Sequence, residues 1–383
     1  MISSVVCLAH HWLVTHRGGE KVLAEMRALF PAAPIATLVF RPSMVRYLCN
    51  SVGVDSPPPI IVSRLRYLPF SARLYKVLLP LHPWAIKKLT APRGTRLVLS
   101  TDASMIKGLC LPEGARQICY CHSPPRYLWD MQAEYSNIGG VLGPLARLVF
   151  RATTPQAKRF DYLAAQKVDF FIANSRFVAS RIERFYGRAA TVVYPPVAVS
   201  DFSPNRTVED FYLLVTQLTP YKRADLAVRA LTKMGKKLVV IGEGSEFSAL
   251  RRMAGPSVQL MGRQPFSVVK DHFERCRAFL YPQIEDFGIT AVEAQAAGKP
   301  VIAFRAGGAL ETVIEGETGV FFEEQTPESL SAAILRFEAM PSAWAGPCRR
   351  NAERFRPERF RAEIKAFLGE HYPELFKDYA WPI

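Results

Sequence analysis

The segment "AFLYPQIEDFGITAVEAQAAGKPVIAF", residues 278–304, contains two short apolar runs that flank a helical stretch. "AFLYPQ" and "PVIAF" have the length and composition of buried strands. Two parallel strands need a crossover connection between them, and a helix is the usual one. The segment therefore predicts a strand, a helix and a second strand in one parallel sheet.

The same alternation occurs along the whole chain. In the first half it includes "SSVVCLA" followed by "GGEKVLAEMRALF", and "VDFFIAN" followed by "SRFVASRIERFYG"; after residue 205 it restarts with "FYLLVTQ", "ADLAVRALTKM" and "KLVVIG". A segment rich in Pro and Ser, "YPPVAVSDFSPNRT", separates the halves and is typical of a linker. The pattern predicts an α/β protein with two Rossmann-like, doubly wound domains that face a central cleft. We expect the domains to span 1–200 and 206–364, with a C-terminal helix of about 365–383 rejoining the first domain.

The composition is that of a globular protein. The chain has 383 residues, enough for two cores, of which 49% are hydrophobic and 22% charged. There is no apolar run of 18 residues, and the N-terminus lacks the basic region of a signal peptide. The seven cysteines show no CxxC spacing, which favours a reducing compartment. We expect a cytoplasmic protein.

The net charge of +15 lies entirely in the first half of the chain. Residues 1–200 contain 25 Lys and Arg against 10 Asp and Glu, whereas residues 201–383 contain 24 of each. Such an excess indicates an anionic partner: nucleic acid, an anionic membrane surface or a phosphorylated substrate. No recognised nucleic-acid-binding module is present, so nucleic acid is the least favoured.

Unusual residues follow three of the predicted strands, in "HRGGEKV", "IGEGSEF" and "EDFGITAVEA". Ligands of parallel sheets bind at these carboxyl ends, where helix N-termini favour anions. In the third motif Glu285 and Glu293 are separated by seven residues that include Gly288. The two carboxylates either hold hydroxyl groups of a ligand or, as the simpler alternative, cap the helix.

The segment "EDFGITAVEAQAAGKPVIAFRAGGALETVIEGETGVFF" closely resembles the donor-binding segment of family-4 glycosyltransferases, which have the GT-B fold. The resemblance extends to "LTPYKRADLAVRAL", "LVVIGEGSE", "LMGRQP", "GGEKVL" and "ICYCHSPPRYLWD", and so covers most of the chain. It implies a retaining hexosyltransferase that needs neither metal nor cofactor.

The resemblance also implies which residues bind the nucleotide-sugar donor. Lys222 matches the lysine that stabilises the departing diphosphate, but Gln217 stands where the family has an arginine. Glu285 is expected to orient the sugar, together with the amides of residues 287–289, and Glu293 to bind the ribose. The expected donor-binding positions are Gly18, Gly19, Gln217, Arg223, Gly242, Gly262, Arg263, Phe287, Gly288, Ile289 and Glu293.

His122, in "YCHSPPRYLWD", follows a predicted strand. A single histidine is more often structural, but the resemblance places this one beside the donor sugar and the acceptor. With Lys222 and Glu285 it completes the expected catalytic set, and Arg126 and Asp130 are candidates for the acceptor side. The histidines at 10, 11 and 16 crowd the first strand exit without a metal-ligand pattern, and we expect no metal site.

The basic half contains "VSRLRYLPFSARLYKVLLPLHPWAIKKL", residues 62–89, and a second basic run from Arg147 to Arg188. Cations interleaved with aromatic and apolar residues favour an anionic bilayer, and the alternative is a core-facing helix with a solvated basic face. Segments in the N-terminal half resemble bacterial polysaccharide mannosyltransferases, which implies GDP-mannose, a lipid-linked saccharide acceptor and the inner face of the cytoplasmic membrane. A UDP-sugar donor (glucose or N-acetylglucosamine), or a GT-B-type nucleotide-sugar epimerase, remains the alternative.

Overall fold

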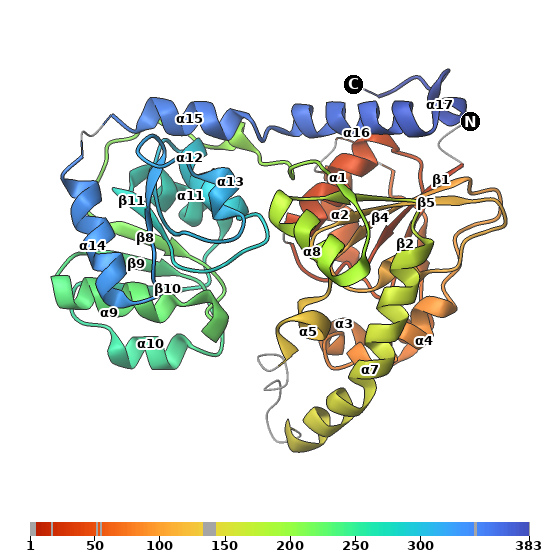
Figure 1. Ribbon diagram of the computed structural model, residues 1–383, viewed down its shortest axis with the longest axis horizontal. Coiled ribbons are helices and arrows are strands. Elements are labelled where there is room, and N and C mark those ends of the chain that lie inside the picture. Colours follow the sequence, from red (N-terminus) through yellow and green to blue (C-terminus); the bar gives the residue numbers. More distant parts are fainter. Residues whose placement is uncertain are drawn as a thin grey trace. The chain divides into compact units, whose positions relative to one another are not determined.

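The computed structural model describes residues 5–16, 18–50, 53, 56–132, 143–340 and 343–382, with the backbone alone for residues 144–146. The chain divides into two compact units (Figure 1). Unit 1 is Met1–Pro196 with Phe360–Ile383, and unit 2 is Val197–Arg359. The predicted bounds were 1–200 and 206–364 with a C-terminal helix of about 365–383, whereas unit 2 begins at Val197 and the chain returns to unit 1 at Phe360.

Unit 1 contains a parallel sheet of seven strands in the order β3-β2-β1-β4-β5-β6-β7. The strands are β1 (Val6–His10), β2 (Ile35–Thr37), β3 (Ile60–Val62), β4 (Leu97–Asp102), β5 (Arg116–Cys121), β6 (Phe170–Ala173) and β7 (Ala190–Val192). The main helices are α1 (Gly18–Leu29), α2 (Pro42–Asn50), α3 (Ser71–Leu74), α4 (His82–Lys87), α5 (Arg126–Trp129), α7 (Gly143–Lys167) and α8 (Arg176–Tyr186).

Both faces of this sheet are covered by helices. Val6 and Leu8 of β1 pack into one apolar cluster with α1 and α2, whereas Cys7 and Ala9 pack into a second cluster with α4 and α7. Successive side chains of a strand point to opposite faces, so a strand buried on both faces consists of apolar residues throughout. This burial explains why "VCLA" does not alternate with polar residues.

The C-terminal helices α16 (Pro357–His371) and α17 (Pro373–Phe376) complete the first of these clusters. Phe360, Ile364, Phe367 and Leu368 recur at helical spacing along α16 and are buried in the same cluster as α1. The chain thus returns to unit 1 because the apolar side chains of α16 are buried against the apolar cluster of that unit.

Unit 2 contains a second parallel sheet, of six strands in the order β10-β9-β8-β11-β12-β13. The strands are β8 (Tyr212–Val215), β9 (Leu238–Ile241), β10 (Val258–Gly262), β11 (Ala278–Tyr281), β12 (Val301–Phe304) and β13 (Gly319–Phe322). The helices are α9 (Ala224–Met234), α10 (Phe247–Met253), α11 (Phe266–Arg275), α12 (Ile289–Ala296), α13 (Ala309–Thr312), α14 (Pro327–Glu338) and α15 (Ala345–Glu353).

The prediction of an α/β protein with two Rossmann-like sheets is confirmed, and the segment 278–304 forms β11, α12 and β12. In each sheet the strand order reverses once, between β1 and β4 in unit 1 and between β8 and β11 in unit 2. Such a reversal leaves a crevice at the carboxyl ends of the two strands. Among the residues that the structure describes, no helix has both the length and the apolar character needed to cross a bilayer.

Candidate functional site

The crevice of unit 2 brings together Lys222 and Glu285. Lys222 lies in a short 3-10 turn (η6, Pro220–Lys222) after β8, and Glu285 lies in the loop after β11. Their side chains form an ion pair, partly shielded from solvent. Two predicted catalytic residues, 63 positions apart in the sequence, therefore meet because β8 and β11 are neighbours in the sheet.

The backbone around Glu285 is fixed by close contacts with glycines. Gly288 has a φ of +96°, and a Cβ at this position would lie 2.4 Å from the hydroxyl oxygen of Tyr281. A Cβ at Gly308 would lie 2.4 Å from the carbonyl oxygen of Phe287, and the amide of Gly308 donates to the carbonyl of Glu285 at 2.9 Å. Only glycine fits in these positions, which holds the 285–288 loop at the start of α12.

Helix α12 begins directly after this loop. Gly288 is its N-cap and Ile289 is its first residue, so the helix N-terminus follows Glu285 closely in the chain. Glu293 is in the second turn and is almost fully buried, as are its apolar neighbours Ala291 and Val292. The predicted sugar-orienting and ribose-binding carboxylates are thus on one short structural element.

The basic residues after β8 point in different directions. Arg223 has a left-handed backbone at the start of α9 and donates to Asp225 and to the carbonyl of Gln325, each at 3.2 Å. Gln217 is exposed in the same loop. Arg223 therefore binds within unit 2, and it does not form the ion pair with Glu285 that Lys222 forms.

The remaining predicted residues of unit 2 are at the ends of β9 and β10. Gly242 has a φ of +151°, and a Cβ there would lie 1.8 Å from the carbonyl oxygen of Thr216, so it lets the β9 loop approach the β8 loop. Gly262 ends β10 with a φ of +67°, and the exposed Arg263 follows it, 3.7 Å from Glu243. All these positions share the edge of the sheet that carries Lys222 and Glu285.

The crevice of unit 1 brings together a glycine turn and two imidazoles. Gly18 and Gly19 begin α1, and a Cβ at Gly19 would lie 3.4 Å from both His10 Cε1 and His122 Nε2. His10 ends β1 and His122 follows β5. The predicted Gly19 and His122 are therefore neighbours, and the ring of His10, the last residue of β1, lies next to the same glycine turn.

His10 is a residue that the motif analysis left without a role. Its side chain is fully buried, and its Nδ1 is 2.6 Å from Thr101 Oγ1, which itself donates to the carbonyl of Ala9. The ring of His10 and the hydroxyl of Thr101 therefore share a buried hydrogen bond at the end of β1. The Nε2 atoms of His10 and His122 are both buried and have no hydrogen-bond partner among the described residues. The sequence signal that could have indicated a role for His10 was its position at the end of a predicted strand.

These imidazoles are neutral at physiological pH. Burial lowers the pKa of His10 to about 4, and burial together with the neighbouring His11 lowers the pKa of His122 to about 3. The pKa of His11 is likewise lowered by burial to about 3. His122 can therefore exchange hydrogen bonds with a ligand but supplies no positive charge there.

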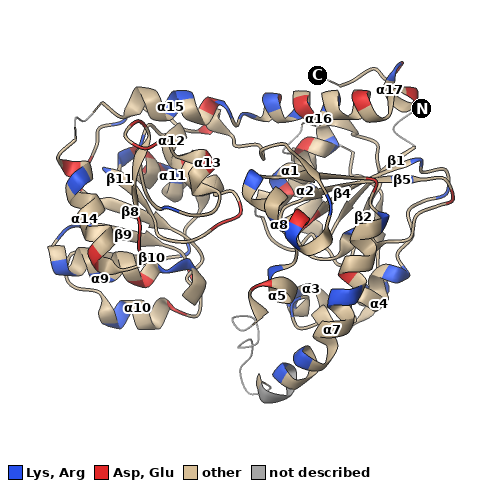
Figure 2. Ribbon diagram, viewed as in Figure 1, with Lys and Arg blue, Asp and Glu red and all other residues tan. Residues whose placement is uncertain are grey.

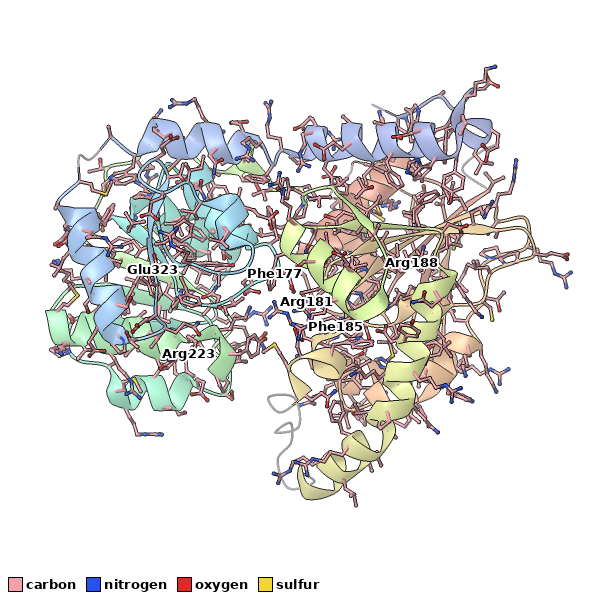
Figure 3. The ribbon with its side chains drawn as sticks, in the orientation of Figure 1. Phe177, Arg181, Phe185, Arg188, Arg223 and Glu323 are labelled. Carbon is pink, nitrogen blue, oxygen red and sulfur yellow. The ribbon has the colours of Figure 1, made fainter. Side chains whose placement is uncertain are left out.

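The two acceptor-side candidates flank the short helix α5. The carboxylate of Asp130 accepts from Arg181, with Arg181 Nη1 2.7 Å from Asp130 Oδ2, and Arg181 also donates to the carbonyl of Pro124. Arg181 lies near the rings of Phe177 and Phe185, one turn before and after it on α8 (Figure 3). Asp130 therefore anchors α5 to α8, while Arg126 Nη1 lies 3.6 Å from Met131 Sδ. Their contact with an acceptor stays a prediction.

A buried ionic network behind the crevice of unit 1 escaped the sequence reasoning. The ammonium of Lys107 binds Asp161 and lies 3.3 Å from Asp102 Oδ2, and Asp161 also accepts from Trp129 and Tyr186. Burial disfavours the charge on Lys107, yet the two carboxylates raise the pKa of its ammonium overall. The amide of His122 donates to the carbonyl of Asp102 at 2.7 Å, so the network supports the strand exit that carries His122.

No cluster of three or more His, Cys, Asp or Glu with metal-binding geometry occurs in the described part of the chain. The seven cysteines are free thiols.

Comparison with known proteins shows what this chain is similar to. The family of glycosyl transferases group 1 matches residues 200–355, which is most of unit 2. An uncharacterized glycosyltransferase of Methanocaldococcus jannaschii is 26% identical over 231 residues, 59% of this chain and 60% of that protein. A GDP-mannose-dependent alpha-(1-6)-phosphatidylinositol monomannoside mannosyltransferase of Mycolicibacterium smegmatis is 28% identical over 192 residues, 42% of this chain and 50% of that one. The chain thus spans between half and two thirds of the length of these relatives.

Solved structures share the fold over almost the whole chain. HepE of Anabaena, in complex with UDP, aligns with a TM-score of 0.70 at 15% identity and covers 95% of this chain and 99% of its own. Sucrose-phosphate synthase of Thermosynechococcus elongatus aligns with a TM-score of 0.67 at 18% identity and covers 98% and 100%. Residues 200–355 therefore resemble the group 1 glycosyl transferases, in a chain that has the GT-B fold of two Rossmann-like units.

Proposed function

We propose that this protein is a retaining glycosyltransferase that moves a hexose from a nucleoside-diphosphate sugar to an acceptor. The Lys222–Glu285 pair in the unit 2 crevice is the observation that carries the proposal. An ammonium next to a carboxylate, beside the amides of α12, suits a ligand that has an anionic group close to hydroxyl groups. A sugar attached to a diphosphate has both.

Each residue then has a separate task. Lys222 stabilises the negative charge that develops on the departing diphosphate, and Glu285 accepts hydrogen bonds from the sugar hydroxyls. The amides of residues 287–289 bind next to it, and Glu293 binds the ribose. In a retaining reaction of this kind the acceptor hydroxyl attacks from the side on which the diphosphate leaves, and a phosphate oxygen takes its proton. The neutral His122 positions hydroxyl groups on unit 1.

The favoured donor is GDP-mannose, because a similar protein is a GDP-mannose-dependent mannosyltransferase and the motifs of the N-terminal half resemble polysaccharide mannosyltransferases. The favoured acceptor is a lipid-linked saccharide at the inner face of the cytoplasmic membrane, in exopolysaccharide or O-antigen assembly. A UDP-sugar is the second candidate donor, since the structurally similar HepE binds UDP and UDP-glucose.

The donor is identified by measuring the thermal shift of the purified protein with GDP-mannose, UDP-glucose and UDP-N-acetylglucosamine. Release of the diphosphate is then measured with and without a membrane lipid extract. A transferase releases diphosphate only with acceptor, whereas an epimerase converts the donor without one. Conversion without acceptor would overturn the proposal.

The role of Lys222 is tested in the same assay. Lys222→Ala should lower kcat about a hundredfold or more, because a lost charge contact to a developing anion costs about 3–4 kcal/mol. Lys233→Ala is the matched control, since Lys233 is an exposed lysine of α9. Near-normal turnover of Lys222→Ala would remove this residue from the leaving-group role.

A further inference from the structure

The segment 64–88 of unit 1 folds into short pieces that alternate buried and exposed side chains. It comprises η2 (Arg64–Tyr67), α3, η3 (Leu79–Leu81) and α4. Leu65, Leu79 and Ile86 are buried in the cluster that also contains residues of β1 and α7. The stretch is therefore not one continuous helix: its short pieces bury these side chains in the core and leave many of the intervening ones exposed to solvent.

These intervening side chains are unusually apolar. Of the 17 large hydrophobic residues exposed in the described parts of the chain, seven lie between Tyr67 and Trp84. Tyr67 is 82% exposed and Phe70 75% exposed. Helix α7, which packs against η3, also carries the exposed Leu148 and Val149. We call the exposed side chains of residues 64–88 the basic aromatic face.

The charge of this face is exclusively positive. The chain has no Asp or Glu between residues 56 and 101. Of its cations, Arg64, Arg66, Arg73, Lys87 and Lys88 are exposed, and none of these has an ion-pair partner among the residues described (Figure 2). Lys88 lies 4.8 Å from the ring centroid of the exposed Trp84. Aromatic rings beside cations are the combination that occupies the headgroup region of a bilayer.

The backbone also holds an aromatic side chain outward. Phe70 has a φ of +56° and a ψ of +21°, a left-handed conformation that costs a non-glycine residue free energy. Apart from Arg223, it is the sole non-glycine residue with a positive φ in the described chain. Its ring is mostly exposed, so burial within unit 1 does not offset this cost.

We propose that the basic aromatic face docks unit 1 onto an anionic phospholipid bilayer, with Tyr67, Phe70 and Trp84 inserted at the headgroup level. The unpaired cations attract the anionic headgroups, and the apolar side chains leave water in the acyl boundary. A second copy of the chain fits less well, because a symmetric dimer would bring this positive face against itself. The inference extends the proposed function, since a lipid-linked acceptor resides in that bilayer.

The test is binding of the full-length protein to sonicated vesicles, measured by cosedimentation. We expect binding to vesicles of phosphatidylcholine with roughly a third phosphatidylglycerol, little binding to pure phosphatidylcholine, and release as salt rises to about 1 M. The fluorescence of Trp84 should shift to the blue on binding, compared with Trp84→Phe. Equal binding to both vesicle types, or none to either, would overturn the proposal.

Two double variants, each with a matched control, test whether the basic aromatic face is the surface that binds the vesicles. Tyr67→Ser/Phe70→Ser should weaken binding to anionic vesicles about tenfold or more, and Arg64→Glu/Arg73→Glu should do the same. Their matched controls are Val208→Ser/Leu335→Ser, which removes exposed apolar groups of unit 2, and Arg251→Glu/Arg252→Glu, which makes the same charge change on α10. Controls that lose as much affinity as the face variants would show a merely global effect and contradict the assignment.

Self-association and catalysis are separated in the same preparations. Sedimentation equilibrium that shows a dimer abolished by Tyr67→Ser/Phe70→Ser would assign the face to a second copy and overturn the bilayer proposal. The thermal shift caused by the donor should be unchanged in these variants, because the substituted residues lie outside unit 2, which contains Lys222, Glu285 and Glu293. Vesicle binding without any transferase activity would leave the docking inference standing and refute only the proposed function.

Discussion

At the scale of single residues, the ion pair between Lys222 and Glu285 keeps two opposite charges together in one crevice. Each charge would be costly to bury alone, and each is matched by its neighbour until a ligand replaces the contact. A ligand with a single charge would leave one partner unmatched. This argues for a ligand that presents an anion and hydroxyl donors side by side.

Glu285 lies in the loop before α12 and Glu293 lies within α12, and their surroundings differ: Glu293 is nearly buried and Glu285 is partly exposed. We expect Glu293→Gln to raise the donor KM about tenfold or more with little change in kcat, since a ribose contact is the same in ground and transition states. Steady-state kinetics with saturating acceptor measures this split. A variant with parental donor affinity would contradict the ribose assignment, and Glu311→Gln, on α13, is a control elsewhere in unit 2.

At the scale of elements, the Lys107 network joins four segments of unit 1 through one buried carboxylate. Asp161 of α7 binds Lys107 of the turn η4 (Ile106–Gly108), Trp129 of α5 and Tyr186 of α8. Both carboxylate oxygens of Asp161 are thus used to position the helices that flank His122. Such an arrangement fixes elements relative to one another, even where its net contribution to stability is small.

Removal of one partner from this network should be strongly destabilising. Asp161→Ala leaves the ammonium of Lys107 and two donors without their acceptor, which we expect to cost about 3–5 kcal/mol of unfolding free energy. The measurement is a urea unfolding curve of the full-length protein. Arg116→Ala, which breaks the exposed pair with Asp169, should leave the midpoint close to that of the parent. An equally small effect of Asp161→Ala would mean that the network is dispensable.

At the scale of the whole molecule, the buried histidines of unit 1 make its stability depend on pH. Burial lowers the pKa of His82 to about 3, as it does for His122, and of His10 to about 4. In the unfolded chain these imidazoles bind protons near pH 6.5, so below that pH the unfolded state binds protons that the folded state does not. Stability is therefore full above pH 6.5 and falls as the pH decreases toward 4.

We expect the unfolding free energy to fall by about 1.4 kcal/mol per pH unit for each such histidine. Between pH 6.5 and 5, most carboxylates remain ionised, so the histidines dominate the slope. His82 lies outside the proposed site. The His82→Gln variant should lack one of these titrations, so its unfolding free energy should fall less steeply as the pH decreases, by about 1.4 kcal/mol per pH unit. Urea unfolding at a series of pH values checks this, and a flat profile between pH 6.5 and 5 would contradict the lowered pKa values.

The sequence by itself determined the fold and one of the two crevices. Apolar runs that alternate with helices specify parallel sheets covered on both faces, because strand and helix periodicities are local properties of the chain. Glu285 and Gly288 were found at a strand exit in the same way, whereas Lys222 was identified through the resemblance of its motif. The resemblance to glycosyltransferases rested on the same contiguous segments, and the family match to residues 200–355 confirms it.

Only the tertiary structure decided which distant residues meet. The pairing of β1 with β4, which are about 90 positions apart, brings His10 against Thr101 and next to Gly19 and His122. The same long-range packing commits Asp130 to Arg181, gathers the Lys107 network and turns the apolar side chains from Tyr67 to Trp84 outward. No local pattern encodes these contacts, because they depend on the order of strands in the sheet and on which helix face finds a partner.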